Sequence, residues 1–569
     1  MLRIGNFNNN TVNFKQASIN IMAFSDTHGD LNGIIPLYQN FHENSKDIFQ
    51  NQNDKSTLNL MTVVGDWFMN PDQKGYLTDP SKTSGDYQAE FFNAFIKNAK
   101  SLIPNLKVLY TPGNHCLDGG AKTLVEHVQK LDLDCIISNA NLSEESTLIN
   151  EIPLENRKKF NEFKILEVQD DKDKSLIHKV LVLGISPINI NYLVKEDISG
   201  LNLFGTNNKK EADMTDDDTK ITAEALNKII LEFKKNNQSS GVILMCHSGE
   251  PVSKAIANEV ADIDLILNAH DHLDKISYVN NKFGTKTKII SLSQNGHKLE
   301  KVNLHFNDSG IKSVTTQSYY TDFEKPQQDN PLKIMYDRLF KKDLDPLVKI
   351  HDQKNRSELA IDDIRYQNND LANFCTDTIL SEIHKKNPEV NVFFMPSTAF
   401  RENLPTSNKR AVTNLDLISL LKGIAGDNSN VMIGKMTGKT LAGFLAENIS
   451  DNLRSPSRNA IIQPSGLNIN RTAISQKVAQ GANLCRSDAE LIYEFVKIQN
   501  SNGKYESISP NIEYTIALPQ KLFVKSTNNE FKKEGRSFSN TQTMISEYFR
   551  NNILNSKSEI DLKIDNRIV

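Results

Sequence analysis

The chain has 569 residues, of which 38% are hydrophobic, and a formal net charge of −4 at pH 7. This length and apolar content suffice for two or three domains with buried cores. The slightly acidic balance, with Lys and Arg scattered along the chain, argues against a broad basic surface for nucleic acid or anionic lipid. The five cysteines are widely spaced and form no Cys-x-x-Cys pair, which argues against a disulfide framework and a thiolate zinc knot.

Residues 1–17 are rich in asparagine and predict a disordered polar arm, because they lack the apolar stretch of a secretory signal. No apolar run approaches the roughly 20 residues that a membrane-spanning helix requires. We therefore expect a cytoplasmic protein with neither a membrane nor a nucleic acid as its partner.

From residue 18 onward, short apolar runs alternate with longer amphipathic stretches. The runs predict buried strands that end in turns, and they lie at 21–24, 58–66, 106–115, 135–142, 179–187, 241–249, 264–272 and 288–293. Helices are predicted between several of them, at Glu90 to Leu102, Thr123 to Leu131 and Ile221 to Lys235. Strands that alternate with helices indicate a layered α/β domain, which we place at 18–322. The acidic run at 216–218 predicts the N-terminal cap of a helix rather than a metal site.

The second half of the chain predicts a separate α+β domain. Residues 323–346 contain three prolines and predict a linker helix, and the domain itself is expected over 347–555. Its predicted helices lie near 368–386 and 413–425, and its predicted strands lie near 391–395, 460–463 and 512–518. Residues 556–569 predict a polar tail. The stretch GKMTGKT at 434–440 is one residue short of a phosphate-binding loop and predicts a turn that opens a helix.

Metal-ligating side chains follow five of the predicted strands, at the point where each strand ends. Asp26 and His28 follow the first predicted strand. Side chains of the same kinds follow later strands, at Asp66, at Asn114 with His115, at His247, and at His270 with His272. Because ligands collect outside the carboxyl ends of strands in layered α/β folds, we expect these loops to converge. Taken singly, Asp66 fits a turn residue better and His247 a core histidine better, whereas Asn114 and His115 fit a turn and a metal site equally well. Five repetitions in order make the purely structural explanation poor.

Two carboxylates, an amide and several imidazoles suit borderline or hard divalent ions: manganese, iron, zinc or cobalt, with magnesium and calcium also compatible. Two such ions about 3.5–4 Å apart can activate a water nucleophile and hold phosphate oxygens. Two divalent cations carry four positive charges against the two negative charges of Asp26 and Asp66. The surplus matches a phosphoryl group.

The order of these motifs resembles that of the calcineurin-like metallophosphoesterases, and more narrowly that of the 5′-nucleotidase family. GNHCLDGG at 113–120 is similar to the family's GNHEFDxG, and SNANL follows at 138–142. In the second half, NDLANFCTDTIL, FFMPSTAFRENLP and QPSGL resemble segments of the family's substrate domain. The resemblance implies a two-layered β-sandwich flanked by helices (α/β/β/α), followed by an α+β substrate domain.

The resemblance also implies the roles of the site residues. Two divalent metal ions would be held, the first by Asp26, His28 and His272, the second by Asn114, His247 and His270, with Asp66 bridging both. His115 would approach the phosphate and the leaving-group oxygen, and Asp118 would orient this imidazole and favour its charged form. Cys116, where the family has Glu, is the remaining alternative as a catalytic nucleophile.

The substrate domain departs from the family's pattern. Arg401 matches the arginine of the family's Asn-x-Gly-Gly-x-Arg stretch and is expected to bind substrate. However, the asparagine and both glycines of that stretch are replaced, by Pro396, Thr398 and Ala399. Asp427 stands about where the family pattern would place an aromatic residue, which leaves Phe523 and Phe531 as the candidates for stacking on a base.

We therefore expect a phosphohydrolase that cleaves phosphate monoesters, with a small-molecule partner such as a 5′-nucleotide or a related phosphate ester. Two alternatives stay open. The same metals could serve a phosphodiesterase acting on cyclic nucleotides, nucleotide sugars or dinucleotides. The chain could also be a binding protein that kept the fold and lost catalysis, although buried Asp and His residues are costly to keep without metal.

Overall fold

The computed structural model describes residues 17–49, 54–71, 82–142, 148, 151–194, 196–209, 213–237, 240–308, 310–341, 344, 346–360, 364, 369–401, 403–421, 424, 429–454, 462–500, 503–520, 522, 532–541, 544–545, 548 and 559–561. Residues 1–16 of the predicted arm lie outside the described residues, as do Asp427, Phe523 and Phe531. The chain divides into two compact units, Met1–Pro71 with Gly85–Ile334 and Asp72–Ser84 with Met335–Val569.

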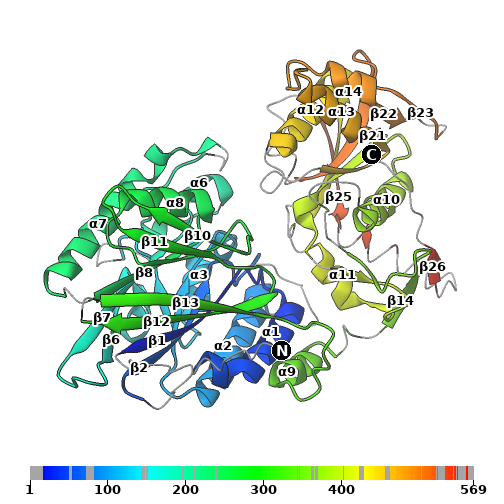
Figure 1. The fold of residues 1–569 in the computed structure, drawn as a ribbon. Helices are drawn as coiled ribbons and strands as arrows, with labels where there is room; N and C mark the ends of the chain where they lie inside the picture. The colour runs from blue at the N-terminus through cyan, green and yellow to red at the C-terminus, as the bar shows by residue number, and fades with distance from the viewer. Residues whose placement is uncertain are drawn as a thin grey trace, which may run out of the picture. The chain divides into compact units, whose positions relative to one another are not determined.

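Two β-sheets form the centre of the first unit (Figure 1). The seven-stranded sheet has the order β13 (Gly310–Tyr320), β12 (Lys298–Asn307), β1 (Ser18–Ser25), β2 (Thr57–Val64), β3 (Lys107–Thr111), β4 (Asp134–Ile136) and β5 (Phe160–Asn161). The six-stranded sheet has the order β10 (Lys275–Asn280), β11 (Lys286–Ser291), β9 (Leu265–Asn268), β8 (Ser240–Cys246), β7 (Ile177–Ile185) and β6 (Phe163–Gln169).

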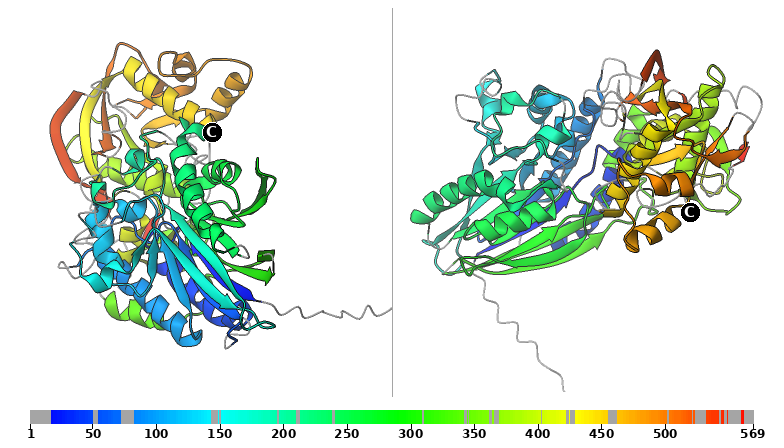
Figure 2. Two further views of the ribbon diagram at one scale, coloured as in Figure 1. Left: turned by 90° about the vertical axis from the view of Figure 1, so that its left-hand side faces the viewer. Right: turned by 90° about the horizontal axis from the view of Figure 1, so that it is seen from above.

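Within each sheet the central strands run parallel. Strands β1 to β5 pair in parallel, and β12 closes on β1 in the antiparallel sense. Strands β7, β8, β9 and β11 form a second parallel series. The long strands β12 and β13 run side by side, as the right view of Figure 2 shows. Parallel alignment brings the carboxyl ends of β1, β2 and β3 to one edge, and those of β8 and β9 to one edge of the other sheet.

The two sheets pack face to face, with helices on the outside. Side chains of both sheets share one core, in which Ile21 and Leu60 of the first sheet join Ile243 and Leu267 of the second. Helix α1 (Leu31–Ile48) packs on β1 and β12, whereas α7 (Lys220–Lys235) and α8 (Gly249–Glu259) cover the six-stranded sheet. This arrangement confirms the predicted α/β/β/α sandwich flanked by helices.

Both faces of the central strands are buried, which explains their nearly continuous apolar sequences. On β1, Ile19, Ile21 and Ala23 point into the sandwich core. Phe24 faces the helices, where its ring lies 5.7 Å from Phe95 of α2 (Ser84–Leu102) and 6.2 Å from Trp67. The alternation has the two-residue period of a strand.

Every apolar run predicted as a strand in this unit overlaps one, and the helices predicted there correspond to α2, α3 (Gly120–Val128) and α7. The acidic run before α7 caps a helical turn as predicted, because Thr215 and Asp218 form a reciprocal capping box. Helix α1 was not predicted. It contains Gly33 and Pro36, which the sequence patterns treat as helix breakers. Asp30 nevertheless starts the helix by accepting a hydrogen bond from the Asn32 backbone N–H.

The second unit is built on a five-stranded sheet with the order β20 (Ile462–Ser465), β16 (Val392–Pro396), β24 (Glu513–Pro519), β19 (Asn430–Thr437) and β25 (Lys532–Asn540). Its main helices, α10 (Asp370–His384), α11 (Asn414–Leu420) and α12 (Gly438–Arg454), confirm the α+β prediction. Strand β19 ends at Thr437 and α12 begins at Gly438, so GKMTGKT spans a junction between a strand and a helix.

Smaller elements complete the described chain. In the first unit these are α5 (Leu154–Arg157) and α6 (Ile190–Leu193). Those after residue 330 are α9 (Pro331–Leu339), β14 (Pro346–His351), β15 (Glu358–Leu359), β17 (Leu404–Pro405), β18 (Val412–Thr413), β21 (Leu467–Ile469), α13 (Arg471–Ala479), α14 (Glu490–Phe495), β22 (Val496–Gln499), β23 (Tyr505–Ser507) and β26 (Glu559–Asp561). Strand β26 falls in the segment predicted as a polar tail and pairs in parallel with β14. None of the described helices is long and apolar enough to cross a membrane.

Candidate metal centre

The loops that follow β1, β2, β3, β8 and β9 meet at the carboxyl ends of their strands. Three groups of side chains there have ligand atoms within 4.8 Å of one another: Asp26, His28 and His272; His28, Asp66 and His115; and Asp66, His247 and His270. Every predicted residue of the set that carries an imidazole or a carboxylate close to a strand end belongs to at least one group. The five loops therefore converge as expected from the pattern.

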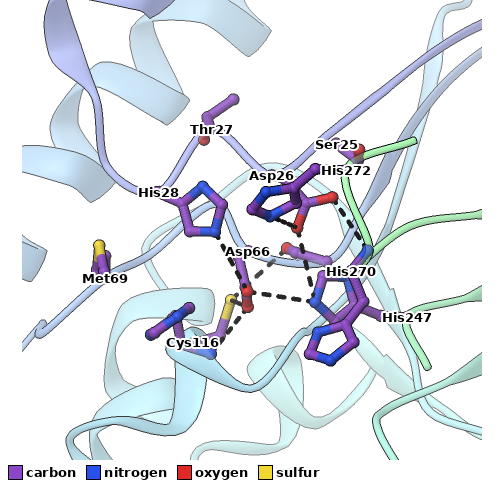
Figure 3. Close-up of polar contacts among 12 residues, drawn as sticks. Ser25, Asp26, Thr27, His28, Asp66, Met69, Cys116, His247, His270 and His272 are labelled. Carbon is purple, nitrogen blue, oxygen red and sulfur yellow. Dashed lines mark hydrogen bonds and ion pairs between the residues drawn. The ribbon is translucent and has the colours of Figure 1, made fainter. Parts of the chain in front are cut away.

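Asp66 lies at the centre of this set, between His28 and His247 (Figure 3). Its Oδ2 atom lies 3.2 Å from Nε2 of His247 and 3.7 Å from Nε2 of His28. Its Oδ1 atom accepts a hydrogen bond of 2.8 Å from the His115 backbone N–H, which fixes the orientation of the carboxylate. Asp66 is thus the one carboxylate shared by two of the three groups.

Asp26 lies close to His247, His270 and His272. Its Oδ1 atom lies 3.7 Å from Nε2 of His247 and 3.9 Å from Nε2 of His272. Its Oδ2 atom accepts a hydrogen bond of 3.2 Å from the His270 backbone N–H. Figure 3 shows His247, His270 and His272 gathered around this carboxylate.

The side chains present fit divalent cations. Asp26 Oδ1 and Asn114 Oδ1 are both buried and have no hydrogen-bond partner among the described residues. Leaving a buried oxygen without a partner is unfavourable, and a cation bound at each of these atoms would satisfy it. The oxygen and imidazole donors suit manganese, iron, zinc or cobalt. Asn114 offers an amide oxygen beside His115, on the loop after β3.

The backbone of the ligand loops is held in an uncommon conformation. Asp26, His28, His270 and His272 have positive φ angles of 49°, 50°, 90° and 56°. Such angles are uncommon for residues other than glycine and cost energy, which the surrounding structure must supply. Their concentration at one site is typical of a functional centre.

Two glycines make room for His247. Gly65 has a φ of +98°, and a Cβ atom there would overlap the His247 ring. A Cβ atom at Gly113 would overlap Asp66 Oδ1 and the same imidazole. These positions therefore require glycine because the ligand side chains approach the backbone directly.

Asn295 is a site residue that the sequence did not reveal. Its Oδ1 atom lies 3.3 Å from Nδ1 of His28, and its backbone N–H donates to the Asp26 carbonyl at 2.9 Å. A partner of this kind on the far ring nitrogen orients a metal-ligating histidine and selects its tautomer. Asn295 also has a positive φ, of 50°. The only signal in the sequence is its place in the turn after the strand at 288–293.

His115 and Asp118 form the predicted pair. His115 Nδ1 lies 2.8 Å from Asp118 Oδ2, which also accepts a hydrogen bond from the Asn70 backbone N–H at 3.2 Å. Gln88 of α2 supports the loop that contains Met69 and Asn70, since its amide makes two hydrogen bonds of 3.0 Å to the backbone of Met69. The His115 ring is 5.4 Å from that of His28.

The buried charges perturb one another. Burial raises the pKa of Asp26 to about 6. Burial acts in the same direction on Asp66, but His247 and His115 outweigh it and hold the pKa of Asp66 well below its usual range. Burial alone would lower the pKa of His247, but the Asp66 and Asp26 carboxylates raise it to about 9. The carboxylates therefore favour positive charge at the centre of the site.

The environment of Cys116 argues against its role as a catalytic nucleophile. Its side chain is fully buried, and burial raises the pKa of its thiol far above the ordinary value. The Tyr110 hydroxyl donates a hydrogen bond of 2.8 Å to the sulfur. A thiol that cannot ionise near neutral pH is inert as a nucleophile.

Arg401 belongs to the second unit and follows the short helical turn Ser397–Ala399. Its backbone N–H donates to the Leu420 carbonyl at 2.9 Å, which ties the loop to the end of α11. Ala399, at the place of a family glycine, is fully buried. Its methyl group therefore occupies space inside the unit.

Comparisons with known proteins agree with this geometry. The calcineurin-like phosphoesterase family model matches residues 19–274. No curated protein sequence matches the chain. Among solved structures, a 5′-nucleotidase precursor from Thermus thermophilus is 12% identical with a TM-score of 0.67, over 97% of this chain and 99% of that one.

Two further structures share the fold over the whole chain. The sulfate thiohydrolase SoxB from Thermus thermophilus, in complex with glycerol, is 14% identical with a TM-score of 0.64, over 97% of this chain and 96% of that one. A Staphylococcus aureus protein provisionally assigned as a 5′-nucleotidase, in complex with α-ketoglutarate, is 15% identical with a TM-score of 0.58. The match covers 97% of this chain and 100% of that one. Residues 19–274 therefore form a calcineurin-like phosphoesterase domain, in a chain that has the two-domain fold of solved 5′-nucleotidase structures and is a metal-dependent phosphoester hydrolase.

Proposed function

We propose that the protein is a two-metal phosphohydrolase that cleaves phosphate monoesters, with 5′-nucleotides or related small phosphate esters as substrates. The position of Asp66 carries this proposal. One of its oxygens lies within 3.7 Å of imidazoles from two different ligand groups, the geometry that a carboxylate shared by two cations requires.

In this proposal Asp26, His28 and His272 hold one cation, Asn114, His247 and His270 hold the other, and Asp66 is common to both. Bound divalent ions supply Lewis acidity, which activates water and stabilises charge on the phosphoryl oxygens. The chain's contribution is to fix the donors. The His115 N–H orients Asp66, Asn295 orients His28, and the His270 N–H orients Asp26.

We assign His115 the role of assisting the leaving group. Its Nδ1 faces Asp118, which leaves Nε2 as the atom directed toward substrate. Because Asp118 holds Nδ1, Nε2 is the ring nitrogen that is free to carry a proton to the oxygen that departs. The Asn70 N–H on the same Asp118 oxygen keeps that carboxylate in place.

For substrate recognition we propose Arg401, whose guanidinium suits a phosphate or ribose oxygen. Likeness of the second unit to 5′-nucleotidase structures supports a nucleotide. Thr398 and Ala399 replace two glycines of the family pattern. Their side chains limit how closely a ligand can approach the backbone there, which favours a related small phosphate ester instead. A screen of substrates decides between them.

The experiment is a phosphate-release screen over nucleotides, sugar phosphates and phosphodiesters, with manganese, magnesium, zinc and cobalt supplied separately. Our proposal predicts metal-dependent turnover of monoesters, and loss of that turnover in Asp66→Asn. Preferential turnover of diesters would identify the phosphodiesterase alternative. Bound metal without turnover of any ester would identify a binding protein.

A further inference from the structure

Asp271 stands between two proposed metal ligands but does not belong to any of the three ligand groups. Its neighbours His270 and His272 both have positive φ angles. Its carboxylate turns away to two partners outside the ligand set. Oδ2 accepts a hydrogen bond of 2.6 Å from the Glu250 backbone N–H, and Oδ1 accepts one of 3.2 Å from the Asn268 side-chain amide.

The bond to Glu250 closes the N-terminus of α8, the helix that begins just after His247. The N-cap residue of this helix, Ser248, makes no side-chain cap, and its hydroxyl accepts a hydrogen bond from the Ile188 N–H. Asp271 therefore supplies an acceptor for a backbone N–H in the first turn, where a negative charge is also favoured by the helix dipole.

The same carboxylate links the loops that carry three proposed histidine ligands. The loop after β8 holds His247, and the loop after β9 holds His270 and His272. Their backbones already pair, through Gly249 N–H to Ala269 O at 3.1 Å and Ala269 N–H to Cys246 O at 2.9 Å. Asp271 adds a side-chain connection beyond these bonds, at the residue between the two histidines.

A carboxylate is required at this position because both of its partners are donors. The Asn268 oxygen accepts from the Ser253 hydroxyl at 2.7 Å, so its NH2 group faces Asp271 and the Ser291 hydroxyl. An asparagine at 271 would turn its own NH2 toward one of the two donors. One bond would then become a contact between two donors.

We propose that Asp271 is a positioning residue that holds His247, His270 and His272 in register for metal binding. The inference rests on the proposed two-metal function and adds a residue outside its ligand set. Hydrogen-bonding groups that orient metal ligands typically change metal affinity by about 10–100-fold when they are replaced.

The test measures Mn²⁺ affinity of the full-length, metal-stripped protein by titration calorimetry, with folding checked by circular dichroism. Asp271→Asn is expected to weaken binding by about 10–100-fold. The exchange variant Asn268→Asp with Asp271→Asn restores a donor facing an acceptor and is expected to recover most of that loss. Should Asp271→Asn fail to fold, Asp271→Ser removes the carboxylate with a smaller polar side chain and is also expected to weaken Mn²⁺ binding.

Two controls separate positioning from other effects. Asp264→Asn alters another carboxylate that accepts a hydrogen bond from a backbone N–H, that of Val242 at 2.8 Å. Asp264 lies at the opposite end of β8 and β9 from the proposed metal centre. This variant is therefore expected to bind Mn²⁺ with wild-type affinity. Asp274→Asn removes the same charge two residues beyond His272, and is expected to lose much less affinity than Asp271→Asn.

Wild-type affinity in Asp271→Asn or Asp271→Ser, or an exchange variant no better than Asp271→Asn, would overturn the inference. So would an equal loss in Asp274→Asn, which would reduce the effect to charge. Failure of the wild-type protein itself to bind Mn²⁺, or any of the other metals in the screen, would instead reject the proposed function.

Discussion

Asp66 Oδ2 lies 3.2 Å from His247 Nε2, although 181 residues separate them in the chain. The first residue follows a strand of the seven-stranded sheet and the second a strand of the six-stranded sheet. The contact therefore joins the two halves of the sandwich at the proposed metal centre. Both side chains are fully buried, so their charges act on one another with little screening by water.

Gly65 provides a test of this close approach. Gly65→Ala places a methyl group in the His247 ring and also strains a residue with a φ of +98°. We expect the variant to lose about 1–3 kcal/mol of unfolding free energy, and to bind metal more weakly, because His247 must move. Urea denaturation and metal titration measure the two effects.

Gly284→Ala is the matched control. Gly284 has a similar φ of +83°, but a Cβ atom there meets nothing within 4 Å. It should show the cost of backbone strain alone, with metal affinity unchanged. If both variants bind metal equally well, the requirement for glycine beside His247 is wrong.

His115 is predicted to act on the leaving group rather than on metal binding. His115→Ala should lower kcat by about 100- to 10,000-fold for nucleotides, the usual contribution of a general acid or base. The loss should be much smaller for an aryl phosphate, whose leaving group needs no proton. Comparing kcat for the two substrates at equal metal content measures this difference; an equal loss for both would contradict the assigned role.

Cys116 is predicted to be dispensable for chemistry. Its thiol is buried and donates toward the Gly65 carbonyl at 3.6 Å, so it packs and cannot attack a substrate. Cys116→Ala should keep kcat within about threefold while losing about 1 kcal/mol of stability, a typical cost of a core substitution. Steady-state kinetics decide, and abolished turnover with intact metal binding would revive the thiol mechanism.

Asp264 predicts a pH dependence of stability that is independent of the metal centre. Burial raises its pKa to about 6. The folded state then binds this proton more tightly than the unfolded chain does. The protonated carboxyl of Asp264 therefore contributes its whole share of the unfolding free energy below about pH 4, and this share is lost as the pH rises through 6. The loss amounts to at most about 3 kcal/mol.

Asp264→Asn removes this titration. From pH 4 to pH 7, the unfolding free energy of the variant should therefore improve relative to wild type by up to about 3 kcal/mol. Urea denaturation at both pH values measures the change. A difference between the two proteins that does not vary with pH would show that Asp264 titrates normally.

The ligand loops could be predicted from the sequence because each follows an apolar strand directly. Asp26, Asp66 and His247 all stand one or two residues beyond a run of buried side chains. Within each parallel sheet this local pattern also places the residues together, since the strand ends share an edge, and the β-sandwich implied by the family resemblance brings the two edges together. No contact between distant residues had to be known in advance.

The supporting residues could not be predicted in the same way. Asn295 contacts His28 across 267 residues, and Asp271 acts on Glu250 across 21. Such partners leave no mark on the local pattern, because an Asn or Asp in a turn is ordinary. Helix α1 was missed for the opposite reason: Gly33 and Pro36 are local breakers that tertiary packing against β1 and β12 overrides.

Metal content is the most direct measurement of the central assignment. Purified wild-type protein, loaded with Mn²⁺ and desalted, should retain two ions per chain by elemental analysis, whereas Asp66→Asn, which replaces the shared carboxylate, should retain fewer and show at least about 100-fold less ester hydrolysis. Wild-type protein that retains none of the divalent metals offered, or Asp66→Asn that keeps both ions and full activity, would contradict it.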